Sequence, residues 1–126
     1  MALTAGRKTA QVKGEFMTLI VAAATTIYAG ALVAADATGK AVPATKAADL
    51  TALGCAEHNA SAGERVTVRR GVFLWDNSGT DAVTDALIGK LCYMEDDCTV
   101  AATATGSSAA GTVLGFEGDQ VIVETR

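Results

Sequence analysis

The chain has 126 residues, of which 50% are hydrophobic, 5% aromatic and 19% charged. This length supports one ordinary domain with a core that needs neither disulfides nor metals. Its apolar residues are mostly Ala and Val, with only three Phe, two Tyr and one Trp, so we expect a thin core that completes its burial in an oligomer or on a larger surface. Ten basic against 14 acidic residues argue against nucleic-acid binding, because the net negative charge repels phosphate.

Charge is uneven along the chain. Residues 1–14 contain Arg7, Lys8 and Lys13 and no acidic residue, a net charge of +3, and the whole chain carries −4, so the remaining residues carry −7. The first 14 residues show neither a helical nor a strand period of apolar residues, which is typical of an extended or mobile segment. We therefore predict a flexible N-terminal arm over 1–14 and a single β-rich domain over 15–126.

Residues 16–35 contain no charged residue and follow a basic stretch, which is also the pattern of a signal peptide or a membrane span. Polar residues and a glycine interrupt the run, and Glu15 directly precedes it, where a signal peptide favours positive charge. Two buried strands explain the run better, so we expect no membrane partner. A secreted protein that uses 16–35 as its signal segment stays an alternative.

Short apolar runs separated by Gly, Asp and Asn continue along the chain and predict an all-β fold. Strands are expected at 18–23, 31–35, 40–43 and 50–57, with a turn at 36–39. Pro43 places the third strand at an edge or an end, because proline cannot donate to a strand ladder. Gly54 marks a bulge in the fourth strand.

The segment 64–75 has the clearest strand pattern. Val66 and Val68 alternate with polar residues, and Gly71 then separates them from a second apolar run at 72–75. A glycine at this place predicts a bulge or sharp bend that lets one long strand serve two sheets. Residues 76–81 follow as a turn. A calcium loop is disfavoured there, because its glycine stands fourth rather than sixth and no glutamate closes the ligand set.

The second half continues the β pattern, with one short exception. Residues 80–89 have helical spacing, with Thr80 or Asp81 as a possible cap, so at most one short helix is expected, around 81–88. Strands follow at 90–94 and 99–103, joined by the acidic residues 95–97, which suit a solvated hairpin loop better than a cation site. A terminal hairpin is expected from 112–116 and 120–124. The predicted architecture is a small β-barrel or sandwich.

Residues that could carry chemistry are few. Cys55, Cys92 and Cys98 are odd in number and form no CxxC pair, so they are read as core residues of an intracellular protein rather than a disulfide framework. Cys55 and His58 have zinc-like spacing, but the second tight pair of a structural zinc site is missing. No nucleophile or second base lies near His58 in sequence, and no serine occupies a GxSxG motif. We expect no enzyme, no metal and no cofactor.

The single tryptophan, Trp75, ends an apolar run that includes Phe73. Both are expected in the core. A β-sandwich that binds a ligand or sugar is an alternative function, since a fold alone does not decide function. In that case Trp75, next to Asp76, would be the platform for the ligand.

Four segments carry a resemblance to a known family, namely 1–7, 27–35, 66–73 and 88–97, together with the turn residues Asp36 and Gly39. They resemble a small capsid protein of Mu-like tailed phages and prophages, along the whole chain. More loosely, the chain is similar to short phage proteins encoded beside the major capsid protein and regarded as decoration, cement or minor capsid proteins. These motifs are strand and turn signatures and carry no catalytic chemistry.

The resemblance implies a structural virion protein. Such a protein sits on the outer surface of the head, is made in the bacterial cytoplasm, and binds as homotrimers between capsomers to stabilise the expanded shell. Its partners would be the major capsid protein and further copies of itself. In such a trimer, Phe73 and Trp75 would lie in the core or at the seam between copies. We expect the arm to contact the capsid, and the candidate contact residues are Leu3, Arg7, Lys8 and Lys13.

Overall fold

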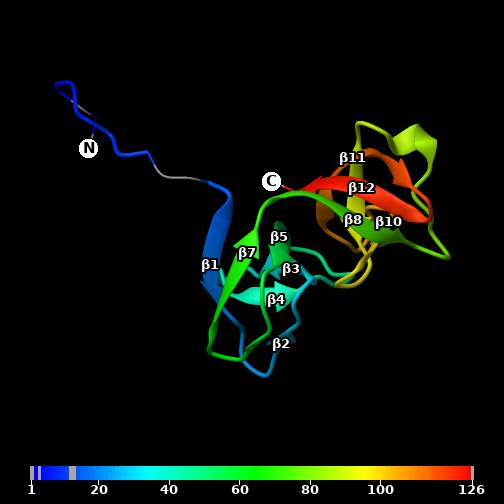
Figure 1. Cartoon of the computed structure of the whole chain (residues 1–126), viewed down its shortest axis with the longest axis horizontal. Coiled ribbons are helices and arrows are strands. Elements are labelled where there is room, and N and C mark those ends of the chain that lie inside the picture. Colours follow the sequence, from blue (N-terminus) through cyan, green and yellow to red (C-terminus); the bar gives the residue numbers. More distant parts are fainter. Residues whose placement is uncertain (1, 3, 12–13, 126) are drawn as a thin grey trace.

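A computed structural model describes residues 2, 4–11 and 14–125 of the chain (Figure 1). The protein is all-β, as predicted, and consists of a five-stranded sheet and a closed barrel. The sheet is built from the first part of the chain, and the barrel is built from Gly71 onward. Residues 4–11 form no helix or strand and run away from the body.

The five-stranded sheet has the order β1 (Phe16–Ile20), β7 (Arg65–Arg69), β5 (Thr51–Ala56), β3 (Leu32–Ala35) and β4 (Ala41–Pro43). All neighbours are antiparallel. A separate pair joins β2 (Thr26–Ile27) and β6 (Ala60–Ser61). Strands this short leave no readable apolar period, so the sequence did not predict them. Pro43 lies in an edge strand, as expected, where its missing N–H costs no ladder bond.

The barrel strands are, in ring order, β10 (Thr99–Ala101), β8 (Gly71–Asn77), β12 (Gln120–Thr125), β11 (Ala109–Glu117) and β9 (Leu91–Met94). The β8–β10 pair is parallel, and the other pairs are antiparallel. The hairpin of β11 and β12 confirms the predicted terminal hairpin. Closure of the ring leaves the barrel without a free strand edge.

The predicted break at Gly71 is where the chain passes from the sheet into the barrel. β7 ends at Arg69, Arg70 donates its backbone N–H to the Glu15 carbonyl, and β8 begins at Gly71. Gly71 has φ +152°, a conformation that residues with a Cβ rarely adopt. One long apolar stretch therefore supplies a strand to each unit.

The predicted bulge at Gly54 is also present. Val33 pairs with Gly54 and Ala34 pairs with Ala52, which leaves Leu53 as the extra residue on β5. Gly54 has φ +146°, and a Cβ there would overlap the Arg69 carbonyl of β7. Glycine is required because the two strand backbones approach closely at this place.

β3 lies between two apolar clusters, which explains why residues 31–35 contain no polar residue. Leu32 and Ala34 face a cluster shared with the barrel, and Val33 faces the cluster on the other side of the sheet. A strand buried on both faces is apolar at consecutive positions. The shared cluster also packs the two units against each other, and it includes Trp75, Cys92, Met94, Val113, Val121 and Val123.

Some expected boundaries were wrong. The first strand is Phe16–Ile20 instead of 18–23, because pairing with β7 starts at Phe16. The uncharged run 16–35 folds as β1, β2 and β3, and no helix among the described residues is long and apolar enough to cross a membrane. The expected helix is the 3-10 turn Asp85–Leu87, which begins after Thr84 without a side-chain cap. Asp81, one of the expected caps, instead accepts hydrogen bonds from Thr103.

Candidate functional site

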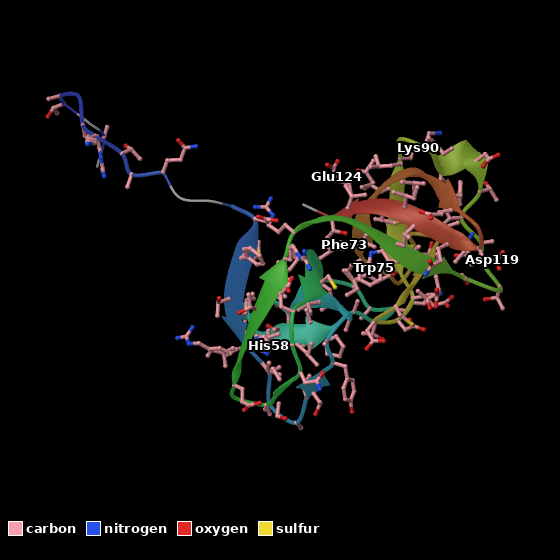
Figure 2. The ribbon with its side chains drawn as sticks, viewed as in Figure 1. His58, Phe73, Trp75, Lys90, Asp119 and Glu124 are labelled. Carbon is pink, nitrogen blue, oxygen red and sulfur yellow. The ribbon has the colours of Figure 1, made fainter. Side chains whose placement is uncertain are left out.

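The lone histidine is tied to the backbone. His58 is exposed, its Nδ1 lies 2.9 Å from the Asn59 carbonyl, and its Nε2 accepts from the Thr67 N–H at 3.2 Å. These contacts assign the proton to Nδ1 and hold the ring beside β7 (Figure 2). Among the hydrogen bonds of the described residues, none joins His58 to a serine or cysteine, so the structure assembles no nucleophile–base pair there.

The loop after β8 contains a cluster of polar side chains that links it to Glu95, the residue after β9. The Ser78 hydroxyl donates to Glu95 Oε1 at 2.6 Å and accepts from the backbone N–H groups of Thr80 and Asp81. The Asn77 amide exchanges two hydrogen bonds with the backbone of Val83. The Ser78 hydroxyl and the Asn77 amide oxygen therefore accept backbone hydrogen bonds from within the same loop. This agrees with the predicted turn.

The three cysteines differ in environment. Cys92 is buried, Cys55 is half-buried and Cys98 is exposed, so the prediction that all three are core residues was wrong for Cys98. Cys98 lies in the hairpin loop, where its N–H and its Sγ both point at Asp96 Oδ1, at 2.9 and 3.4 Å. Burial raises the pKa of Asp96, but hydrogen bonds from Cys98 and Thr99 outweigh it and hold that pKa below its ordinary value.

Asp96, Asp97 and Cys98 bring their ligand atoms within 4.8 Å of one another. The contacts of Asp96 are those of a tight turn between β9 and β10, since its carboxylate accepts the N–H two residues on. We assign the group to the hairpin loop that the sequence predicted. The Cys55–His58 pair of the zinc hypothesis is not part of this group.

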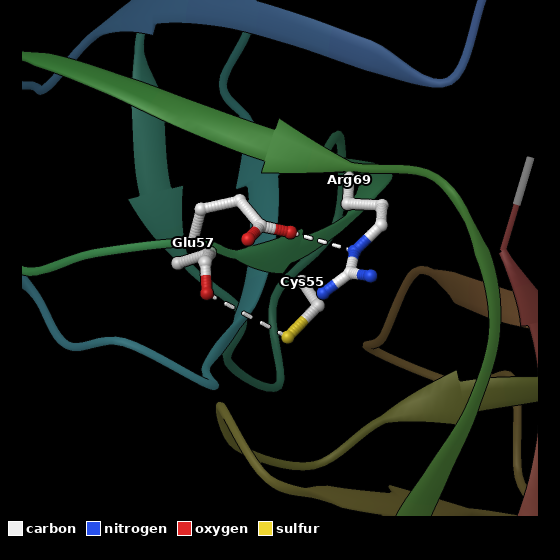
Figure 3. A network of polar contacts seen from close by, with 4 residues as sticks. Cys55, Glu57 and Arg69 are labelled. Atoms are coloured by element: carbon white, nitrogen blue, oxygen red, sulfur yellow. Dashed lines mark hydrogen bonds and ion pairs between the residues drawn. The ribbon is translucent and has the colours of Figure 1, made fainter.

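A polar network ties β5 to β7 on one side of the sheet (Figure 3). Arg69 Nε lies 2.6 Å from Glu57 Oε1, with both side chains partly exposed. The Cys55 thiol donates to the Ala56 carbonyl, and burial, with the nearby Glu57 charge, raises its pKa. A raised pKa makes the thiol a poor nucleophile. The network therefore links the end of β5 to β7.

Phe73 and Trp75 point into the barrel. Their ring centroids are 5.7 Å apart, Phe73 is half-buried, and Trp75 is only 4% exposed. Figure 2 shows both on β8 beside the barrel interior. A ring this deeply buried offers no face to a sugar, so the structure does not support Trp75 as a ligand platform. Its Nε1 has no hydrogen-bond partner, the one such buried side-chain atom in the described part of the chain.

The net negative charge lies entirely on the barrel. Residues 15–70 contain five basic and five acidic residues, whereas residues 71–126 contain two basic and nine acidic ones. The predicted acidic body is therefore a neutral sheet joined to a barrel of charge −7. Figure 2 shows Asp119 and Glu124 on the barrel, with Lys90 as its described basic residue. The arm and the barrel have opposite charge.

The arm candidates are only partly described. Arg7 and Lys8 are exposed, and neither forms a salt bridge within the described part of the chain. Leu3 and Lys13 lie outside the described residues. The side chains of Arg7 and Lys8 are therefore available to a partner.

The outer surface of the barrel carries an apolar face that the sequence analysis did not identify. Val72 and Leu74 of β8 are 47% and 40% exposed, and Leu114 of β11 is 47% exposed. Leu74 pairs with Ile122 of β12, and β12 lies between β8 and β11 in the barrel. The exposed side chains of β8 and β11 therefore belong to one outer face. The signal was present in the run 72–75, because consecutive apolar residues on a strand predict burial on both faces. Within one copy, only the face with Phe73 and Trp75 is covered.

Comparison with known proteins supplies the family. A model of the phage cement proteins matches residues 14–121. The chain belongs to the phage cement protein family. No curated protein and no solved structure matches it. Cement proteins are structural components of the virion capsid. The match begins at residue 14, the last residue of the predicted arm.

Proposed function

We propose that this cement protein binds the outer surface of the phage head as trimers between capsomers and stabilises the expanded shell. The family assignment carries the capsid role. The opposite charges of arm and barrel support an orientation in which the arm reaches toward the major capsid protein and the acidic barrel faces outward. The Mu-like origin inferred from the resemblance belongs to this proposal.

Stabilisation follows from linkage. A protein that binds the expanded shell and not the unexpanded one lowers the free energy of the expanded state by RT ln(1 + [L]/Kd), about 2.7 kcal/mol per site at a hundredfold excess over Kd. A trimer that contacts several shell subunits adds the effective concentration of its second and third contacts. Cementing therefore requires no chemical reaction.

The arm is proposed as the capsid contact. Arg7 and Lys8 are exposed there, with Leu3 and Lys13 as the further candidates. A flexible arm that orders on its partner gains contacts without repacking the body. The contact is expected to weaken with salt, since exposed charges are screened within about 8 Å at physiological ionic strength.

The apolar outer face of the barrel supports self-association. Val72, Leu74 and Leu114 are each about half exposed, and burying such side chains contributes on the order of 1 kcal/mol apiece. A cyclic trimer would cover this face in every copy and close without open ends. It would also supply the burial that the thin core lacks.

Binding to heads that lack this protein tests the proposal directly. Wild-type protein is expected to co-sediment with expanded heads and to leave unexpanded heads unbound. Arg7→Glu with Lys8→Glu is expected to lower the bound fraction about tenfold, whereas the same charge change at the exposed Lys40 and Lys46 of the body leaves it unchanged. Absence of binding to either form of head would refute the cement function.

Oligomer formation is tested by sedimentation, in solution and after release from heads. Leu74→Asp places a charge in the apolar face and is expected to reduce the trimer to monomers. Tyr28→Asp makes the same kind of change at a side chain that is 62% exposed, outside the barrel, and serves as the control. A trimer that persists in Leu74→Asp and is lost in Tyr28→Asp would place the self-contact on the sheet instead.

A further inference from the structure

The outer edge of β1 carries backbone groups with no partner in the described chain. β1 ends the sheet order and pairs only with β7. Glu15 accepts from the Arg70 N–H at 2.8 Å, and the Val21 N–H donates to the Glu64 carbonyl at 2.8 Å, so both residues face the β7 side. Alternate residues of a strand direct their backbone groups to the same side.

The intervening residues of β1 therefore face outward. Phe16, Thr18 and Ile20 direct their N–H and C=O groups away from β7. Ala22, the next residue in this series, confirms the alternation, because its N–H donates to the Ala41 carbonyl of β4 at 3.0 Å. Val21 and Ala41 form a parallel β-bridge, in which the Ile20 carbonyl faces the Ala41 N–H, so β4 closes this end of the edge. The N–H groups of the other three have no backbone acceptor in the described chain outside the strand pairings.

This edge lacks the devices that normally prevent a strand from pairing. Residues 16–20 contain no charge, no proline and no glycine, and Phe16 is 52% exposed. Natural edges are usually blocked by Lys, Pro or a bulge. The opposite edge of the same sheet ends with Pro43. In Figure 1, β1 lies on the outside of the body, and the arm runs away from it without covering it.

The charge around the edge is positive, which favours an acidic partner. Residues 1–20 and 65–70 contain six basic residues and a single acidic one, Glu15. The side chains of Arg65 and Arg69 lie on the same face of the sheet as those of Ile20 and Phe16, because these residues are paired across the two strands. Arg69 has Glu57 as its ion-pair partner, and Arg65 has no salt bridge within the described chain. A strand laid beside β1 would thus meet a cationic surface.

We propose that an extended acidic segment of the shell subunit adds to the free edge of β1 as a further strand of the sheet. This inference rests on the proposed function, and it names the surface and the chemistry of the contact. Main-chain hydrogen bonds to Phe16, Thr18 and the N–H of Ile20 fix the segment, and its acidic side chains lie toward Arg65. This contact would adjoin that of the basic arm, because the arm directly precedes β1 in the chain.

Amide hydrogen exchange tests the pairing residue by residue. In the free protein, the amides of Met17, Leu19 and Val21 exchange slowly and those of Phe16, Thr18 and Ile20 exchange fast. Binding to expanded heads is expected to slow the second set at least about tenfold. Protein that binds heads with no change in these amides would overturn this inference and leave the cement function standing. Protein that does not bind heads would overturn the proposed function instead.

Two pairs of variants test the hydrogen bonds and the charge. Thr18→Pro removes an outward N–H without loss of a bond to β7, and Thr18→Val keeps that N–H. Both are expected to melt like the wild type, and the proline variant alone is expected to bind heads about tenfold more weakly. If the proline variant does not fold, Thr18→Glu and Thr18→Lys replace the pair: an acidic partner is repelled by Glu and not by Lys. Equal head binding by these two variants would refute an acidic partner.

Discussion

The close approach of β5 and β7 at Gly54 gives the sharpest test of the fold. In Gly54→Ala, the new Cβ would overlap the Arg69 carbonyl, and the backbone would keep a φ of +146° that alanine rarely adopts. Strained φ costs about 1–3 kcal/mol, and forcing extra volume into a packed place costs about 1–3 kcal/mol more. We therefore expect a loss of about 2–6 kcal/mol in the free energy of unfolding.

Equilibrium unfolding in urea measures this loss as a lower midpoint at unchanged slope. Gly39→Ala is the matched control. Gly39 also has a positive φ, +82°, but a Cβ there meets no atom within 4 Å, so only the backbone strain of about 1 kcal/mol is expected. If Gly54→Ala were no less stable than Gly39→Ala, the close strand approach would be refuted.

Three further predictions concern side chains. Ser78→Ala removes the 2.6 Å hydrogen bond to Glu95. It is expected to lower the free energy of unfolding by about 2 kcal/mol, because hydrogen bonds to charged groups are worth about 1.5–3 kcal/mol. Urea unfolding measures this loss, and an unchanged midpoint would contradict it. In native protein at pH 8, a thiol reagent is expected to modify the exposed Cys98 first and to leave Cys92 unmodified, since burial raises the pKa of Cys92 to about 11 and only about one thiol in a thousand is then ionised. Equal labelling rates would argue against a closed barrel. Hydrogen bonds, chiefly from the Thr38 hydroxyl, lower the pKa of Asp36, so its contribution to stability is present above the unfolded pKa of about 3.9 and is lost as the pH falls through the folded pKa. Thermal melts of Asp36→Asn should depend less on pH in that window than those of the wild type.

The charge distribution suggests how one small protein separates two tasks. The neutral sheet adjoins the basic arm, and the barrel carries the net charge of −7. In the proposed binding mode, a basic contact beside an acidic outward surface would favour one orientation on the shell and disfavour the reverse. The apolar outer face of the barrel, defined by Val72, Leu74 and Leu114, would then remain for the proposed contacts between copies.

The sequence by itself determined the fold class and the approximate positions of most strands along the chain. The period of two at Val66 and Val68, the glycine at 71 and the two apolar runs of the terminal hairpin are local signals, and local backbone preference is enough to read them. The bulge at Gly54 was predicted for the same reason. The family resemblance rested on these same strand and turn signatures, and the cement family assignment agrees with it.

Only the tertiary structure decided which apolar residues are covered. The runs 31–35 and 72–75 look alike in sequence, yet β3 is buried on both faces whereas β8 exposes Val72 and Leu74. The exposed position of Cys98 and the free edge of β1 were likewise decided by strand pairing across long separations. Burial and register depend on what lies across the sheet, and a local pattern carries no record of that neighbour.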